Sequence, residues 1–107
     1  MTDTRKLNLL YYNTFLKCRD IVTNAAIPID ISVSYADDIN EVMKHIMSSN
    51  NTDMLFIDYD GSAAVIDLVS AVHKYDEDLL IYFITDIDND EEKIKAYNTG
   101  VIDYFIL

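Results

Sequence analysis

Three groups of polar side chains stand directly after apolar runs of the sequence, where a β-strand would end. Asp58 and Asp60 follow one such run, Thr85 and Asp86 follow the next, and Tyr12-Asn13-Thr14 follows the first. In an open parallel α/β sheet the functional crevice lies at the carboxyl ends of the strands, so these residues are the candidates for chemistry. Carboxylates gathered there could hold a hard cation such as Mg²⁺.

The cation site that these residues would form is incomplete. Mg²⁺ requires several oxygen ligands, and Asp58 with backbone carbonyls supplies few of them. Asp60 and Asp86 could partly substitute for the missing ligands if their side chains turn inward, which would give a variant site. We therefore expect weak or no Mg²⁺ binding at Asp58 and Asp60, and no required cofactor. His45 and His73 have no partner at metal-ligand spacing and are predicted to be surface residues.

The elements that would position these side chains can be predicted from apolar periodicity. Five segments rich in β-branched and aromatic residues predict five strands. They are Leu7 to Tyr12, Ile29 to Ser34, Met54 to Asp58, Leu79 to Thr85 and Val101 to Ile106. The third and fourth are almost continuously apolar, which is typical of strands covered on both faces of a parallel sheet.

The segments between these strands have apolar residues at helical spacing. The predicted helices lie at Phe15 to Ala25, at Ile39 to Met47, at Val65 to Val72 and around Ile94 and Tyr97. Asp37 or Asp38 can cap the second helix, and Gly100 can end the fourth. The carboxylates between Asp86 and Glu92 suit the N-terminus of the fourth helix, because they complement its dipole.

Strict alternation of strands and helices predicts one α/β domain over residues 1–107, with a parallel sheet and helices on both of its sides. The sequence ends at Leu107, directly after the fifth strand. We therefore expect the last helix to be missing from this chain, which leaves apolar sheet surface bare. Downstream sequence or a second copy, in a homodimer, would cover that face.

Composition excludes several classes of function. The formal net charge is −11, with 19 acidic and 8 basic residues, so we expect no direct nucleic-acid binding by this domain. No apolar run is long enough to span a bilayer and the N-terminus lacks a secretory pattern, so a cytoplasmic location without membrane contact is expected. Cys18 is the single cysteine, which excludes an internal disulfide.

Three segments, in this order and spacing, form a recognisable set: Leu55-Phe56-Ile57-Asp58, Ile81-Tyr82-Phe83-Ile84-Thr85 and Gly100-Val101-Ile102-Asp103-Tyr104-Phe105-Ile106. Over essentially its whole length the chain resembles the CheY-like receiver domains of two-component response regulators. The resemblance implies a flavodoxin-like, doubly wound sheet of five parallel strands in the order 2-1-3-4-5. It also implies that Asp58 is the phosphoacceptor and that Thr85 and Tyr104 are switch residues.

The chain departs from the pattern of that family at the site itself. In the family, an acidic pair after the first strand holds Mg²⁺; here Tyr12 and Asn13 take its place, or Asn13 and Thr14 in a shifted alignment. The position of the family's lysine falls on Leu107, and the loop after the phosphoacceptor is Tyr59-Asp60-Gly61-Ser62. A phosphoryl group beside a carboxylate requires concentrated positive charge, which these residues do not supply. The resemblance therefore implies a degenerate site.

The first hypothesis is a pseudo-receiver: a regulatory domain of two-component signal transduction, not an enzyme, that acts through protein contacts. Its partners would be a histidine kinase, an output domain or a second copy. The resemblance implies an interaction face at the fourth helix and fifth strand, with Tyr97 and Tyr104, although Tyr104 is equally well explained as a half-buried strand aromatic. The alternative is a functional receiver phosphorylated on Asp58.

A remote alternative belongs to another class of protein. The segment from Asp58 to Ser62 is also similar to the Asp-x-Asp-Gly-Thr signature of haloacid-dehalogenase-type phosphatases. There Asp58 would be the nucleophile and Asp60 the acid, with Thr85 at the second motif. That family also needs a later lysine and further acidic ligands, and the chain after Thr85 is too short to build them, so the motif stands without its context.

Overall fold

The computed structural model describes residues 7–15, 20, 22, 24, 30–48 and 52–107. The strands are β1 (Leu7–Tyr12), β2 (Ile31–Ala36), β3 (Met54–Asp58), β4 (Leu80–Thr85) and β5 (Asp103–Ile106). The helices are α2 (Ile39–Ser48), α3 (Ala63–Tyr75) and α4 (Asp90–Thr99). Along the described chain, strands and helices alternate from β2 to β5, as the sequence predicts.

The strands form one sheet in the order β2-β1-β3-β4-β5, and every pair of neighbours is parallel. This is the doubly wound, flavodoxin-like order, which confirms the predicted fold. The register pairs Tyr12 with Ile57 and Asp58 with Ile84. The carboxyl ends of β1, β3 and β4 therefore lie next to one another at one edge of the sheet.

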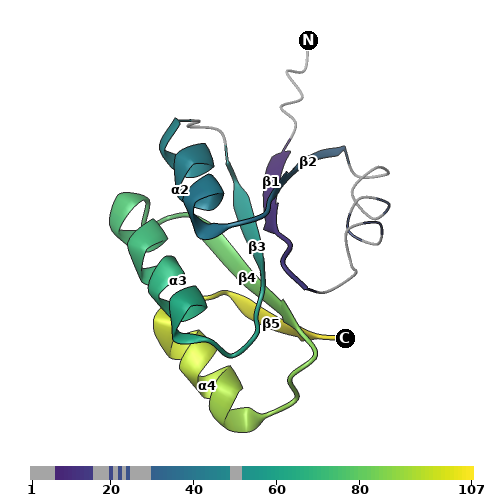
Figure 1. The fold of residues 1–107 in the computed structure, drawn as a ribbon, viewed down its shortest axis with the longest axis vertical. Helices are drawn as coiled ribbons and strands as arrows, with labels where there is room; N and C mark the ends of the chain where they lie inside the picture. Colours follow the sequence, from purple (N-terminus) through teal and green to yellow (C-terminus); the bar gives the residue numbers. More distant parts are fainter. Residues whose placement is uncertain (1–6, 16–19, 21, 23, 25–29, 49–51) are drawn as a thin grey trace.

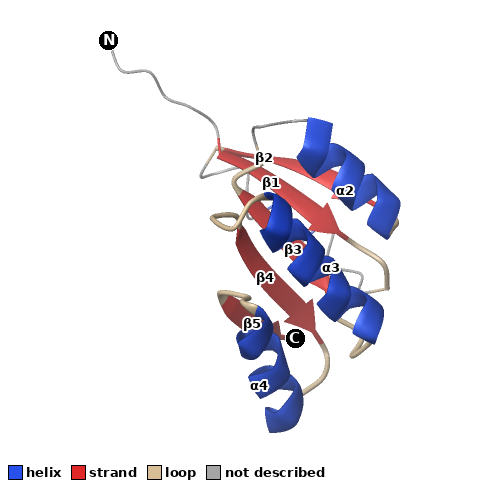
Figure 2. Cartoon of the chain, turned by 90° about the vertical axis from the view of Figure 1, so that its left-hand side faces the viewer, coloured by secondary structure: helices blue, strands red, loops and turns tan. Residues whose placement is uncertain are grey.

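The described helices α2, α3 and α4 lie on the same side of the sheet, as Figure 1 and the rotated view in Figure 2 show. Val42, Val69 and Ala96, one from each helix, are wholly buried there against strand residues. A smaller buried cluster with Leu9 and Tyr11 lies on the opposite face. Burial of one large aliphatic side chain contributes roughly 1.5–3 kcal/mol, and among the described residues the helix-covered face holds the larger buried cluster.

Side-chain caps fix where the helices begin. The Asp38 carboxylate accepts a hydrogen bond from the Glu41 amide at 2.8 Å, which identifies Asp38 as the cap of α2. Ser62 caps α3, and Asn89 caps α4 by accepting from the Glu92 amide at 3.2 Å. Each cap satisfies an amide that the helix itself leaves without a partner. The predicted acidic start of the fourth helix is confirmed.

The second strand lies later in the chain than predicted. The prediction ran from Ile29 to Ser34, whereas β2 extends to Ala36 and begins after Asp30; Ile29 lies outside the described residues. Asp30 has a φ of 58°, in the left-handed region, so it forms a turn before the strand. Polar Ser32 and Ser34 do not end the strand, because β2 is at the edge of the sheet, where a strand need not be continuously apolar.

The fifth strand begins at Asp103 instead of Val101, because the Val101 amide still takes part in capping the C-terminus of α4. The Val101 amide donates to the Ala96 carbonyl, and Gly100 before it has a φ of 111° and caps the helix. A Cβ at position 100 would lie 3.0 Å from His73 Cε1, so both backbone and space favour glycine there. The predicted role of Gly100 is confirmed.

The helix predicted from Phe15 to Ala25 falls mostly outside the described residues. Of its positions, Asp20, Val22 and Asn24 are described and helical, and Val22 packs against the smaller buried cluster. None of the helices in the described ranges has the length and apolar character that a membrane span requires.

Candidate functional site

Asp58, the last residue of β3, is the centre of the candidate site. Four apolar or sulfur-containing residues precede it in the strand, and the register places it between β1 and β4. Its exposed fraction is 0%, which is unusual for a carboxylate. A buried carboxylate is costly unless hydrogen bonds or a cation compensate it, so the groups around Asp58 determine what it can do.

Residues of β1 and the loop after it donate hydrogen bonds to the Asp58 carboxylate. The Tyr11 hydroxyl donates to Oδ1 at 2.5 Å, and the Asn13 side-chain amide donates to Oδ2 at 2.9 Å. The backbone amides of Thr14 and Phe15 also donate to Oδ2, at 2.8 and 3.1 Å. Both carboxylate oxygens are thus bound by protein donors.

Hydrogen bonds to a charged acceptor contribute about 1.5–3 kcal/mol each, and two successive amides aimed at one oxygen form an anion-binding concavity. In this chain the anion in that concavity is the protein's own Asp58. The carboxylate is therefore stabilised by dipoles. Within residues 7–15, 20, 22, 24, 30–48 and 52–107, no group of three or more His, Cys, Asp or Glu side chains could hold a metal ion.

Tyr12 and Asn13, the two positions predicted to replace an acidic pair, lie on different sides of the sheet. Asn13 contacts Asp58, but Tyr12 is buried in the core on the helix-covered face. Burial raises the pKa of the Tyr12 hydroxyl, and the charges of Asp38 and Asp60 raise it further. Tyr11, which no motif of the sequence marks, points to the Asp58 side instead. Alternation along β1 could have identified it, since Tyr11 is two residues before Asn13.

Asp60 and Asp86, the possible substitute ligands, are both exposed. The Asp60 Oδ1 atom accepts from the Ser62 amide at 2.9 Å and so supports the turn into α3. Hydrogen bonds from Ser62 hold the pKa of Asp60 below its usual range. Asp60 thus lies at the start of a helix. The phosphatase hypothesis instead requires an acid whose side chain lies beside Asp58.

Thr85, at the end of β4, is fully buried, and its hydroxyl makes two hydrogen bonds to backbone groups. The hydroxyl donates to the Tyr59 carbonyl at 2.9 Å and accepts from the Ile87 amide at 3.0 Å. In this arrangement Thr85 connects the loop after β3 with the loop after β4. The predicted switch residue is therefore part of the local backbone network.

Tyr59 and Tyr104 form an aromatic cluster with Phe83 beneath α4. The rings of Tyr59 and Phe83 stack with centroids 4.5 Å apart, and Tyr104 meets Tyr59 edge-on at 6.0 Å. Tyr104 is 6% exposed, and its hydroxyl donates to the Ile87 carbonyl at 2.9 Å. The side chain of Tyr104 therefore lies inside the protein, as a strand aromatic does, instead of on a contact surface.

Tyr59 also bonds to α4, a contact that no sequence motif indicates. Its hydroxyl donates to Glu92 Oε2 at 2.5 Å, and Lys95 contacts the other carboxylate oxygen at 3.2 Å. Burial raises the pKa of Tyr59, while the hydrogen bond from Tyr59 holds the pKa of Glu92 below its usual range. The register of strand and helix brings these residues together across 33 positions, which explains why spacing alone could not find them.

Leu107 follows β5 and lies beside Thr85, whose carbonyl accepts from the Leu107 amide at 2.9 Å. Its side chain is 64% exposed and carries no charge. The position expected for the family's lysine is thus adjacent to the site and filled by an apolar residue.

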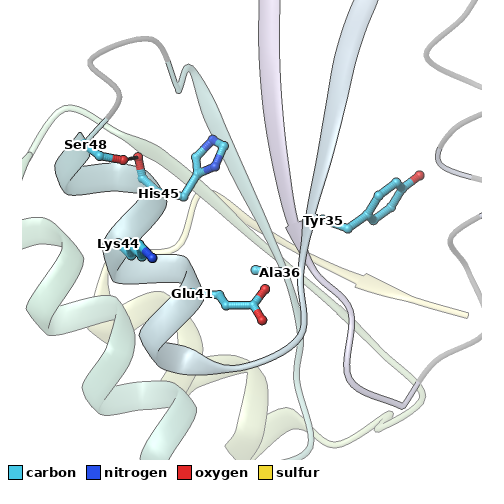
Figure 3. A pocket seen from close by; sticks show the side chains of 6 residues that line it. All are labelled: Tyr35, Ala36, Glu41, Lys44, His45 and Ser48. Atoms are coloured by element: carbon cyan, nitrogen blue, oxygen red, sulfur yellow. Dashed lines mark hydrogen bonds between the residues drawn. The ribbon is translucent and has the colours of Figure 1, made fainter.

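A separate pocket of about 250 Å³ lies between α2 and the end of β2, away from Asp58. Figure 3 shows Glu41 and His45 directed toward β2 and Tyr35 directed away from the pocket. Its lining also includes Ala36, Lys44 and Ser48, so opposite charges line it and no single ligand chemistry is favoured. Of the two histidines, His73 lies near the Leu79 carbonyl, with Nε2 at 3.3 Å.

No protein-family model and no curated sequence matches this chain. Solved structures do match. A response regulator from Thermotoga maritima has a TM-score of 0.85 at 14% identity, over 95% of this chain and 85% of that one. A CheY-like receiver domain protein from Methanospirillum hungatei JF-1 has a TM-score of 0.80 at 14% identity, over 95% and 82%.

The phosphorylated cyanobacterial phytochrome response regulator is similar to the same degree, with a TM-score of 0.81 at 10% identity, over 95% of this chain and 81% of that one. At such low identities, similarity concerns the fold and does not transfer the site. Strand order, helix placement and these superpositions agree, and the chain has the fold of the CheY-like receiver domains of response regulators.

Proposed function

We propose that this chain is a receiver-like regulatory module, not an enzyme, which acts through protein contacts and does not use Asp58 as a phosphoacceptor. The observation that carries the proposal is the binding of both Asp58 oxygens by Tyr11, Asn13 and the following loop amides. A carboxylate attacks a phosphodonor through an oxygen lone pair; here one donor engages Oδ1, three converge on Oδ2, and the group is fully buried, so a phosphodonor would have to displace these contacts.

The charge at the site supports the same proposal. A phosphoryl group on Asp58 would need positive charge to offset its own, usually from a metal ion and a cationic side chain. Leu107 offers no charge, and the described lysines lie on α2, α3 and α4, on the other face of the sheet from Asp58. We expect Mg²⁺ binding, like the phosphorylation that depends on it, to be weak or absent, because Asn13 and not a carboxylate contacts Asp58 from the loop after β1.

Intact-mass analysis after incubation with acetyl phosphate and Mg²⁺ tests this proposal. We expect no phosphoryl adduct on the wild type or on Asp58→Asn, while a receiver domain known to accept phosphate is modified in parallel. Mg²⁺ titration should leave tyrosine fluorescence unchanged. An adduct on the wild type that is absent from Asp58→Asn would overturn the proposal and favour a functional receiver.

The protein contacts are proposed to use the α4–β5 surface. Ile94, Tyr97 and Ile102 are exposed there, and the Tyr97 hydroxyl donates to Asp103 at 2.9 Å, which joins the helix to the strand. α4 carries both acidic residues and lysines, so it can pair with a second copy as well as with another protein. A homodimer, a histidine kinase and an output domain are the candidate partners, in the cytoplasm and without nucleic acid.

The molar mass in solution tests the homodimer. Light scattering should give a concentration-dependent dimer for the wild type and a monomer for the double variant Ile94→Glu/Ile102→Glu. Met47→Glu, a matched exposed apolar position on α2, should behave as the wild type. A wild type that stays monomeric at high concentration would leave the kinase or output domain as the partner.

A further inference from the structure

β2 lies at one edge of the sheet, and β1 is its neighbour among the described strands. Both faces of β2 are in contact with other parts of the chain. Ile31, Val33 and Tyr35 pack against the smaller buried cluster, as Val22 does, and Ala36 belongs to the core beneath α2. Even so, all residues of β2 before Ala36 are partly exposed. The accessible part of β2 is therefore its outer edge, where an edge strand presents backbone amides and carbonyls.

The two edges of the sheet differ in how well they resist the addition of another strand. β5, at the far edge, is four residues long and begins with Asp103, and short length and charge both discourage strand addition. β2 is six residues long, and its sequence Ile-Ser-Val-Ser-Tyr-Ala contains no charge and no proline. Its β-branched and aromatic residues favour an extended backbone. In a chain with a net charge of −11, β2 is thus an edge strand without the usual protection.

The pocket of about 250 Å³ lies beside this edge. The described residues that line it all come from β2 and α2. Figure 3 shows Glu41 and His45 directed toward β2. A strand added to a sheet projects alternate side chains to the two faces, so one of its side chains would lie in the recess beside Ala36. The lining is polar and carries both charges, which suits a polar side chain.

We propose that the outer edge of β2 takes up an extended segment of a partner protein as a further strand of the sheet. Backbone hydrogen bonds would supply affinity, and the pocket beside Ala36 would select a polar side chain. The six residues of β2, at about 3.3 Å each, give roughly 20 Å of edge, which a segment of about six to eight residues covers.

Charge argues against a second copy as the occupant. If two β2 strands paired antiparallel over their full length, Val33 would face Ser34 of the other copy, and at both ends Asp30 of one copy would come opposite Asp37 of the other. Like charges directly opposite each other destabilise a strand pair. A segment with lysine or arginine at its ends would instead meet opposite charge. The proposed segment is therefore uncharged at its centre and basic at its ends.

The proposal concerns a different surface from the α4–β5 contact and does not involve Asp58, so it can fail independently of the proposed function. The test uses the whole chain and a labelled ten-residue peptide in which valine and glutamine alternate between terminal lysines. Its matched control has the same side chains but methylated backbone nitrogens at its central residues, so it cannot donate to a neighbouring strand. Fluorescence anisotropy should show saturable binding of the first peptide, and binding of the control at least tenfold weaker.

Hydrogen exchange locates the bound peptide. In its presence the amides of Ile31–Ala36 should exchange more slowly, and those of Asp103–Ile106 at the other edge should be unchanged. Ser48→Phe, which narrows the pocket, should weaken binding at least tenfold. Met47→Phe, at an exposed neighbouring position of α2 outside the pocket lining, is the matched control and should bind as the wild type. Circular dichroism establishes that each variant used is folded.

Four results would overturn the proposal. No binding of the unmethylated peptide, or equal binding of both peptides, would show that the edge does not add a strand. Slower exchange at Asp103–Ile106 and not at Ile31–Ala36 would place the peptide at the other edge. Unchanged binding by folded Ser48→Phe would exclude the pocket. A wild-type dimer whose β2 amides are protected without peptide would assign the edge to a second copy.

Discussion

Asp58 and Tyr59 are consecutive residues at the end of β3, and opposite faces of the sheet hold them by different means. Asp58 is polar, and hydrogen bonds from β1 and its loop surround it. The side chain of Tyr59 is held by stacking on Phe83 and by a hydrogen bond to Glu92 on α4. The one anchors the loop after β1, and the other anchors a helix. The difference shows that a strand end can join a loop and a helix when protein donors hydrogen-bond its charged side chain.

The largest effect should come from removal of the aromatic anchor. Tyr59→Ala deletes a fully buried ring that contacts Phe83 and Tyr104, and we expect the free energy of unfolding to fall by about 4 kcal/mol. Urea denaturation measures the change. Tyr75→Ala, at an exposed tyrosine of α3, is the matched control and should have a much smaller effect. Equal losses of stability in Tyr59→Ala and Tyr75→Ala would show that Tyr59 is no special anchor.

The polar anchor is expected to contribute somewhat less. Asp58→Ala leaves the Tyr11 hydroxyl and the loop amides without their acceptor, and we expect a loss of roughly 3 kcal/mol in urea denaturation. Asp60→Ala, two residues later and exposed, should change stability little. If Asp58→Ala were as stable as the wild type, the carboxylate would be a strained group kept for chemistry, and phosphorylation would regain support.

A single donor to Asp58 should have a smaller effect. Tyr11→Phe keeps the ring and removes the hydroxyl that donates to Oδ1, so the expected loss is about 1.5 kcal/mol. Tyr97→Phe removes an exposed hydroxyl bonded to another carboxylate and serves as the control. Unfolding of both variants at the same urea concentration would contradict a special contribution of the Tyr11 hydroxyl.

The smallest effect is a pH dependence on the Tyr59 side of the junction. Tyr59 lowers the folded-state pKa of Glu92 below 4.5, so Glu92 contributes stability above its unfolded pKa and loses it as the pH falls through the folded value. Tyr59→Phe should raise the pKa of Glu92, as NMR titration of the carboxyl group can measure. As the pH falls from above the ordinary pKa of Glu92 through its lowered folded-state value, the wild type should then lose more stability than Tyr59→Phe. An unchanged Glu92 pKa would contradict the contact.

The sequence predicts the sheet well because its central strands are continuously apolar. β1 and β3 have the predicted bounds, and strand order follows the resemblance. β2 differs because it is an edge strand, in which Ser32 and Ser34 interrupt the apolar pattern that marks a strand. The apolar stripes that predicted α2 and α3 are buried, whereas Ile94 and Tyr97, which predicted α4, are exposed and its buried residue is Ala96. Gly100 marked the end of α4 correctly.

The candidate site is harder to predict, because its partners come from different strands. Asp58 and Asn13 could be named from strand ends, and the structure brings them together. Which neighbouring tyrosine faces Asp58 depends on the pleat of β1: alternation places Tyr11 there and Tyr12 in the opposite core. The bond between Tyr59 and Glu92 depends on how α4 docks, and no local pattern in the sequence records that docking.

The two hydrogen bonds of the Thr85 hydroxyl have a mechanical consequence. Through Thr85 the Tyr59 carbonyl is connected to the Ile87 amide, and the Ile87 carbonyl is connected to the Tyr104 hydroxyl. The ring of Tyr104 in turn rests against that of Tyr59, which closes the circuit. The loops after β3 and β4 and the Tyr104 side chain of β5 are therefore linked, and we expect a displacement of one of them to be transmitted to the other two.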